Sequence, residues 1–154
     1  MKLLISLVIL QASLLFVSSE TIRTKNCDGT ELFGNTTAVE VDPCPTQPCV
    51  LHKGGSSTIK VHFTPNANTT TLKMALHGYV SFVWVPFPIS EPSVCDDSEG
   101  SECKCPLTAG ENYIASKTVP IASYFPSMNV KISVELKDQD DNDITCVEFP
   151  LTLA

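Results

Sequence analysis

The sequence MNVKISVEL, residues 128–136, alternates between apolar and polar side chains at every position. Met128, Val130, Ile132, Val134 and Leu136 share one parity, and polar side chains separate them. An alternation with period two predicts a β-strand that buries one face and exposes the other. Because a one-sided strand needs a second layer to cover its apolar face, this stretch predicts a sandwich of two sheets.

The same alternation recurs on both sides of this stretch. It is weak over residues 38–41 and clear over 59–63, 72–84 and 147–153. Within the run 72–84 we expect Gly78 to mark a bend or bulge. Segments rich in Pro, Gly, Asn or Asp separate the runs, at 43–48, 54–55, 65–68, 86–92 and 138–143. Helical periodicity is hard to find. The 154 residues therefore predict one all-β domain, an immunoglobulin-like β-sandwich of two antiparallel sheets with about seven strands.

The N-terminus predicts a secretory signal peptide. A basic start is followed by an apolar run over residues 3–17 and by small residues suited to cleavage after Ser19. A membrane anchor is the alternative, but the run is shorter than a spanning helix requires and polar residues interrupt it. We therefore divide the chain into a signal peptide, 1–19, and one domain, 20–154. We expect a secreted, extracellular glycoprotein or a resident of the endosomal or lysosomal lumen, with glycosylation at Asn35 and Asn68 in their N-x-[ST] triplets.

Charge and motifs exclude several function classes. Ten Lys and Arg oppose 17 Asp and Glu, and the resulting net charge of −7 repels nucleic acid. The three histidines are scattered and form no hydrolase or metalloprotease signature, so we predict no enzyme, no catalytic residue and no cofactor. Residues 138–143 begin like a calcium loop, but Asp143 and Phe149 stand where that loop needs Gly and Glu. We predict a hairpin turn there, and no metal site.

The seven cysteines predict disulfides, because the expected compartment is oxidising. The pairs that the spacing suggests are Cys44 with Cys49, Cys27 with Cys146, and Cys95 with either Cys103 or Cys105. A zinc site built on the last three is disfavoured, since a Cys-x-Cys spacing departs from the usual ligand pattern. One thiol is left over in any pairing.

Two proline-containing segments are apolar where loops are normally polar. Residues 83–89 are apolar on both parities, and their prolines argue against regular strand pairing. Residues 119–126 repeat the combination of prolines and large apolar side chains. These segments either cap the end of the core or line the mouth of an apolar cavity between the sheets. The composition alone does not separate the two interpretations.

A resemblance to a known family favours the cavity. The motifs that carry it are, in order, Asp42-Pro43-Cys44-Pro45-Thr46-Gln47-Pro48-Cys49, Lys53-Gly54, His77-Gly78, Val85-Pro86-Phe87-Pro88-Ile89, Glu91-Pro92, Cys105-Pro106-Leu107 and Tyr124-Phe125-Pro126-Ser127. With them the chain resembles the Niemann-Pick type C2-like proteins of the ML-domain (MD-2-related lipid-recognition) family over essentially its whole mature length. The resemblance implies an apolar cavity between the sheets. It also implies disulfides Cys27–Cys146, Cys44–Cys49 and Cys95–Cys105, with Cys103 as the extra thiol.

The resemblance also implies ligand-binding residues. Those that match the entrance are Val85, Phe87, Ile121 and Phe125. Those that match the tunnel wall are Val41, Ile59, Leu76, Val80, Val119, Val134, Val147 and Phe149. Phe125 stands where the mammalian sterol carriers have Tyr, and Val134 and Val147 stand where they have Trp, so the implied cavity differs in shape from theirs.

The function that the resemblance implies is lipid binding and transfer without catalysis. We expect a monomer that carries a sterol or similar apolar lipid and contacts a membrane surface transiently. Because the protein is acidic, we expect it to approach an anionic membrane either through local basic residues such as Lys53 and Lys117 or at a lysosomal pH that partly neutralises its carboxylates. The implied partner is a membrane sterol transporter resembling the Niemann-Pick type C1 protein, or an immune receptor. The alternative is an innate-immune or chemosensory protein that binds microbial lipids, fatty acids or small hydrophobic signals.

Overall fold

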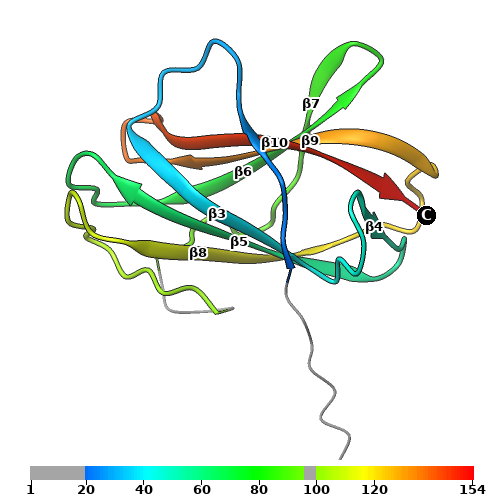
Figure 1. The fold of residues 1–154 in the computed structure, drawn as a ribbon, viewed down its shortest axis with the longest axis horizontal. Coiled ribbons are helices and arrows are strands. Elements are labelled where there is room, and N and C mark those ends of the chain that lie inside the picture. The colour runs from blue at the N-terminus through cyan, green and yellow to red at the C-terminus, as the bar shows by residue number, and fades with distance from the viewer. Residues whose placement is uncertain (1–19, 96–99) are drawn as a thin grey trace, which may run out of the picture.

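Two β-sheets packed face to face make up the protein in the computed structural model, which describes residues 20–95 and 100–154 (Figure 1). The predicted all-β sandwich is confirmed, although the described residues form ten strands where about seven were expected. The predicted signal peptide, residues 1–19, lies outside the described residues. Within the described ranges there is no helix that is long and apolar enough to cross a membrane.

The strands divide into a four-stranded and a six-stranded sheet. In order across the first sheet they are β1 (Glu20–Thr21), β3 (Gly34–Asp42), β5 (Ser56–Pro65) and β8 (Tyr113–Pro120). In order across the second they are β2 (Lys25–Asn26), β10 (Asp143–Leu153), β9 (Met128–Lys137), β6 (Lys73–Val80) and β7 (Val83–Phe87). A short strand, β4 (Cys49–Leu51), pairs in parallel with the end of β10, and the other pairings are antiparallel.

The alternating stretch 128–136 lies at the centre of the second sheet. As β9 it pairs with β10 on one side and β6 on the other, and Val134 lies opposite both Val147 and Leu76. Val134 and Leu136 are fully buried, because their parity faces the first sheet. The hydrophobic pattern therefore fixes which face of this strand meets the core.

We had expected residues 72–84 to form one strand, but the structure divides this run into two strands. Ser81 and Phe82, with φ of 50° and 69°, form a two-residue turn that reverses the chain between β6 and β7. Positive φ at both central residues is the geometry of a type I′ hairpin turn. The reversal places Trp84 beside Tyr79 rather than on the face of Leu76, and Phe82 projects from the tip with 89% of its surface exposed. Gly78 lies within β6, paired on both sides, and marks no break.

The expectation that prolines exclude pairing in residues 83–89 is also wrong. Val83–Phe87 forms β7, in which Pro86 lies opposite His77. Because β7 is the last strand of its sheet, a residue without an N–H group is tolerated at this edge. The apolar segment is therefore a strand in its first half and a loop only from Pro88 onward.

A hairpin turn joins β9 to β10 in the predicted segment 138–143, with residues 138–142 between the strands and Asp143 as the first residue of β10. The buried carboxylate of Asp138 accepts hydrogen bonds from the backbone N–H groups of Asp140, at 2.8 Å, and Asn142, at 3.0 Å. Asp141 adopts a left-handed φ of 66°. The carboxylate that would be a first calcium ligand is thus engaged in closing the turn.

Three disulfides join Cys27 to Cys146, Cys44 to Cys49 and Cys95 to Cys105, the pairs that the resemblance implied. The first ties the segment after β2 to β10 across 119 residues, whereas the second closes a local loop of 5. Cys103 takes part in none of these disulfides and is buried, with 1% of its surface exposed.

Both predicted glycosylation sites lie on the surface. Asn35 and Asn68 are exposed, and the Asn68 side-chain oxygen accepts a hydrogen bond from the backbone N–H of Ala109. Their glycosylation stays a prediction.

Removing the two disulfides of unequal span should destabilise the fold unequally. Chain entropy predicts a loss of about 5 kcal/mol for Cys27→Ala with Cys146→Ala, and of about 2 kcal/mol for Cys44→Ala with Cys49→Ala. Urea denaturation of the two double variants measures the difference. Equal losses would show that the long loop is restrained by something other than its disulfide.

Candidate functional site

An apolar cavity of about 260 Å³ lies between the two sheets. It occupies the end of the sandwich where β4 and β10 finish, and β5, β6, β7, β8 and β9 complete its wall. Ser57 supplies the single polar side chain of the lining, and its hydroxyl donates to the backbone oxygen of Asp42 at 3.4 Å. A bound molecule therefore meets hydrocarbon on nearly every side, which suits an apolar ligand.

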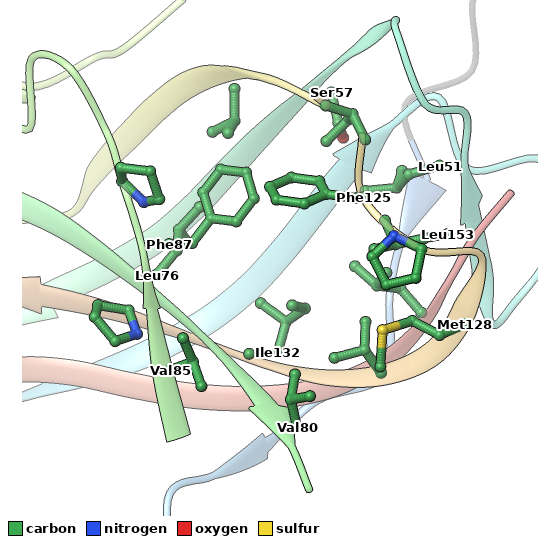
Figure 2. A pocket seen from close by; sticks show the side chains of 18 of the residues that line it. Leu51, Ser57, Leu76, Val80, Val85, Phe87, Phe125, Met128, Ile132 and Leu153 are labelled. Carbon is green, nitrogen blue, oxygen red and sulfur yellow. The ribbon is translucent and has the colours of Figure 1, made fainter. Parts of the chain in front are cut away.

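Two phenylalanines face each other beside the mouth of the cavity. The ring centroids of Phe87 and Phe125 are 5.4 Å apart with a tilt of 53° (Figure 2). Phe87 ends β7, and Phe125 lies in the loop after β8, where its N–H group donates to the backbone oxygen of Ala122. Val85 and Pro88 flank the opening on the β7 side. The mouth is thus built from the two segments, 83–89 and 119–126, that the sequence marked as unusually apolar.

The structure brings together eight of the twelve predicted ligand-binding residues. The eight that line the cavity are Ile59, Leu76, Val80, Val85, Phe87, Val119, Ile121 and Phe125. The other four, Val41, Val134, Val147 and Phe149, are buried in the core outside this cavity. A ligand-contacting role for any of the twelve stays a prediction.

Several lining residues were not among the twelve predicted ligand-binding residues. They are Leu51, Met128, Val130, Ile132, Leu151, Leu153, Pro86, Pro88 and Pro126, besides Ser57 and Gly78. Val130 and Ile132 share the inward parity of Val134, so the alternation did carry a signal for them. The sequence held no such signal for Leu51, because its position depends on the non-local parallel pairing of β4 with β10.

The two lysines expected to face a membrane have different environments. Lys53 lies near the mouth, where its ammonium group donates to the Ser127 hydroxyl at 2.8 Å. Lys117 is only 8% exposed, and its ammonium group donates to the backbone oxygen of Ser93 at 3.3 Å. Because Lys117 shares the inward parity of Ala115 and Val119, the expectation that it meets a membrane is wrong.

The outer face of the β6–β7 hairpin carries a cation between two aromatic rings. The Lys131 nitrogen lies 5.0 Å from the ring centroids of both Tyr79 and Trp84. It also lies 3.1 Å from the carboxylate of Glu148, a residue with 8% of its side chain exposed. These cation–π and ionic contacts stabilise the packing of the hairpin against β9 and β10, in addition to the backbone pairing of β6 with β9.

A second ionic group lies on the same sheet. Glu135 contacts His77 at 2.9 Å and Lys137 at 3.3 Å, and Lys137 contacts Asp143 at 2.8 Å. Burial lowers the pKa of Lys137, but its hydrogen bond to Asp143 and the charges of Asp143 and Glu135 outweigh burial and hold the pKa above its ordinary value. Across residues 20–95 and 100–154, no three His, Cys, Asp or Glu side chains converge as metal ligands.

Comparisons with known proteins agree with this geometry. A family profile described as the ML domain matches residues 21–153. The chain is 31% identical over 147 residues to the NPC intracellular cholesterol transporter 2 of Danio rerio, covering 96% of this chain and 95% of that protein. It is 34% identical over 133 residues to the protein of the same name from Bos taurus, covering 86% and 85%. Among solved structures, a Niemann-Pick type C2 protein from the Japanese carpenter ant superposes with a TM-score of 0.76 at 25% identity, covering 86% of this chain and all of that one.

Lys131→Met should destabilise the protein by about 1–3 kcal/mol, because it leaves the Glu148 carboxylate buried without its ammonium partner. Lys73→Met is the matched control, since its contact with Asp141 is solvent-exposed on both sides and should contribute less than about 1 kcal/mol. Urea unfolding of both variants measures the difference. Equal effects would mean that the aromatic and carboxylate contacts of Lys131 add nothing to stability.

Proposed function

Because the chain belongs to the ML-domain family, we propose that it binds a sterol or similar apolar lipid in the cavity between its sheets and transfers it without catalysis. The proposal goes with secretion, or delivery to the endosomal or lysosomal lumen, as the predicted signal peptide implies. The names of its relatives in Danio rerio and Bos taurus, NPC intracellular cholesterol transporters 2, support cholesterol or a related sterol as the cargo.

The observation that carries the proposal is the composition of the cavity wall. Its lining offers hydrocarbon and aromatic carbon with the single hydroxyl of Ser57, which is already bonded to Asp42. An apolar ligand gains the transfer free energy of leaving water, whereas a polar group would be buried there without hydrogen bonds. The polar head of a ligand is therefore expected at the mouth, near Phe87 and Phe125.

The size of the cavity suggests that the mouth widens when a ligand enters. Its volume of about 260 Å³ lies below the roughly 300–1,000 Å³ of sites that enclose drug-sized ligands. We propose that separation of the Phe87 and Phe125 rings, whose centroids lie 5.4 Å apart beside the mouth, enlarges the cavity. At about −0.3 kcal/mol per heavy atom, a ligand of about 28 such atoms gains about 8 kcal/mol, or roughly micromolar affinity. Such affinity suits a carrier that must also release its cargo.

Apolar side chains beside the mouth suggest how the protein meets a membrane. Phe82 and Tyr124 are 89% and 82% exposed, and they come from the β6–β7 hairpin and the loop that carries Phe125. Phe82 adopts a left-handed φ that disfavours a large side chain. Neither burial nor backbone preference therefore explains why a phenylalanine occupies this position. We propose that Phe82 and Tyr124 enter the interfacial region of a bilayer, with Lys53 and Lys131 near the headgroups.

Native mass spectrometry of protein secreted from eukaryotic cells, followed by organic extraction, tests the proposed function. A sterol at close to one molecule per protein is the expected result. Fatty acids or microbial lipids would instead favour an immune or chemosensory role. A protein that is empty, and that also fails to take up an apolar fluorescent probe, would overturn lipid carriage.

Phe87→Ala and Phe125→Ala should each weaken binding of a fluorescent sterol about tenfold, because each removes an aromatic wall of the mouth. Tyr124→Ala is the control, since that ring contacts Phe125 but does not line the cavity. Titration with dehydroergosterol measures affinity, and circular dichroism checks the fold. If both Phe variants unfold while Tyr124→Ala does not, the two rings cap the core rather than guard a ligand.

Phe82→Gly should raise stability and slow transfer at the same time. Glycine relieves the left-handed strain, a gain of about 1 kcal/mol, but it removes the side chain proposed to enter the bilayer. Sterol transfer between vesicles should slow severalfold with binding affinity unchanged. Phe33→Ser, which removes a partly exposed phenylalanine near Asp143, at the end of β10 away from the mouth, should leave transfer unchanged. Unaltered transfer by Phe82→Gly would contradict docking through the hairpin.

A further inference from the structure

A pocket of about 310 Å³ lies on the outer face of the second sheet, away from the first sheet. On β9, Val134 faces the core, so Ser133 and Glu135, which line this pocket, point to the opposite side. The same alternation places His77 of β6 and Trp84 of β7 on the outer face. Figure 1 shows the β6–β7 hairpin and the loop before β3 extending beyond the second sheet on this side, and both contribute to the wall. The sheet itself therefore separates this pocket from the apolar cavity.

Both walls of the outer pocket are held in place by contacts within the protein. The loop before β3 begins at Cys27, which is joined to Cys146 of β10 by a disulfide and by a backbone hydrogen bond of 3.0 Å. On the other side, Trp84 contacts Tyr79 with ring centroids 5.1 Å apart and lies 5.0 Å from the Lys131 nitrogen. A pocket whose walls are fixed in advance loses little conformational entropy when a ligand binds.

Hydrogen-bonding side chains cross the floor of the pocket in a row. Glu148, Ser133 and His77 lie opposite one another on β10, β9 and β6. Neighbouring strands are about 4.8 Å apart, so one six-membered ring can span two members of this row. Glu135 lies beside the row and accepts a hydrogen bond from the Ser133 hydroxyl at 3.1 Å, and Asp28 adds an exposed carboxylate from the loop. Most of these groups are acceptors.

Two atoms of this floor lack hydrogen bonds. Residues 20–95 and 100–154 contain four buried side-chain nitrogen or oxygen atoms without a hydrogen-bond partner, and two of them are His77 Nδ1 and Glu148 Oε2. His77 Nδ1 lies 2.9 Å from Glu135 without the alignment of a hydrogen bond, and Glu148 Oε2 has only the ionic contact with Lys131 at 3.1 Å. Since buried polar groups normally have hydrogen-bond partners, the floor has unused capacity, which a small side-chain rotation would bring to a ligand.

The charges around the pocket favour a neutral ligand. Its three carboxylates are each paired with a lysine that does not line it: Asp28 with Lys25 at 2.9 Å, Glu135 with Lys137 at 3.3 Å, and Glu148 with Lys131 at 3.1 Å. A cationic ligand would therefore neutralise no unpaired charge. A paired carboxylate still has free lone pairs, so a neutral ligand with several hydroxyl donors could use them.

Trp84 adds an apolar surface to these acceptors. The side chain lines the pocket and is 38% exposed, which leaves part of the indole ring accessible. A pyranose ring has C–H groups on its faces and hydroxyl groups around its edge. It can place a face against an indole ring and donate from its edge to carboxylates, and it removes apolar surface from water in doing so.

We propose that the outer pocket binds a neutral sugar ring, which packs against Trp84 and donates hydrogen bonds to Asp28 and Glu135. This binding site is additional to the proposed lipid carriage and does not depend on it, because the two sites lie on opposite faces of the sheet. The sugar could belong to the oligosaccharide of a glycoprotein or to the headgroup of a neutral glycolipid, and both present the same chemistry.

Intrinsic fluorescence tests the site directly, because Trp84 is the single tryptophan of the sequence. Delipidated protein is titrated with glucose, galactose, mannose and N-acetylglucosamine, and with glycerol as a polyol that has no ring. We expect a saturable change in emission with at least one sugar and none with glycerol. Absence of saturable binding by every sugar would overturn the inference.

Asp28→Asn should weaken binding of that sugar about tenfold, because it removes a charged acceptor from an exposed loop without disturbing the fold. Asp140→Asn is the matched control, since it removes an exposed carboxylate outside the pocket and should leave the affinity unchanged. Trp84→Ala should abolish binding in isothermal titration calorimetry, with circular dichroism to check the fold. Equal affinities of Asp28→Asn and Asp140→Asn, or tighter binding of arginine amide than of any sugar, would contradict a sugar site.

Two further measurements separate the sources of the sugar and the two proposed sites. Binding to phosphatidylcholine vesicles that contain a neutral glycosphingolipid, beyond binding to vesicles without it, would assign the sugar to a lipid headgroup. Binding to an immobilised N-linked oligosaccharide would assign it to a glycoprotein, and failure in both formats would overturn the inference. Dehydroergosterol binding is measured on the same protein, so that loss of the sugar site alone leaves lipid carriage standing, whereas failure to bind any apolar ligand contradicts the proposed function.

Discussion

β9 and β10 pair along almost their whole length, from Lys137 opposite Asp143 to Met128 opposite Leu153. In the second sheet, β2, β4 and β6 pair directly with one of these two strands, and β7 is attached through β6. One face of the pair is apolar at every second position, so it must be covered, and the first sheet covers it. At its Asp143 end the two strands are joined by a tight turn whose amide groups are bonded to Asp138. At the other end β10 is extended by parallel pairing with β4, and there the core gives way to the cavity.

The transition from core to cavity follows from the size of the side chains and the spread of the sheets. Near Val134 and Val147 the inward side chains meet across the sandwich and are fully buried. Toward Leu153 the wall must be completed by β4, β7 and the loop after β8, whose proline-containing segments pack less regularly than strands. A protein interior is normally filled to crystal-like density. A ligand in the unfilled space at this end would recover the missing contacts.

The β6–β7 hairpin combines strain with exposure. Its tip holds Ser81 and Phe82 at positive φ, and it places aromatic and aliphatic side chains in solvent beside the mouth. Lys131 of β9 contacts the rings of Tyr79 and Trp84 in the hairpin and the buried carboxylate of Glu148 in β10, and these contacts stabilise the position of the hairpin. The contacts of Lys131 thus support both β7, which carries Phe87, and the turn that exposes Phe82 to solvent. The proposed ligand entry and the proposed membrane contact therefore both depend on this hairpin.

The sequence by itself determined the two-sheet class, the inward parity of residues 128–136 and the two apolar segments at the mouth, because periodicity and proline content are local properties. The prediction of one strand over residues 72–84 was wrong, since Ser81-Phe82 lacks the Asn and Gly that mark a type I′ turn. The prediction for Lys117 was wrong because a charged residue was expected at the surface, although its position in the alternation points inward. Only the tertiary structure decided which apolar residues line a cavity and which fill the core. Val134 and Ile132 have the same local pattern, and their different roles depend on what lies across the sandwich. The placement of Leu51 depends on the parallel pairing of β4 with β10. Such contacts join residues far apart in the chain, and no local pattern encodes the distance between them.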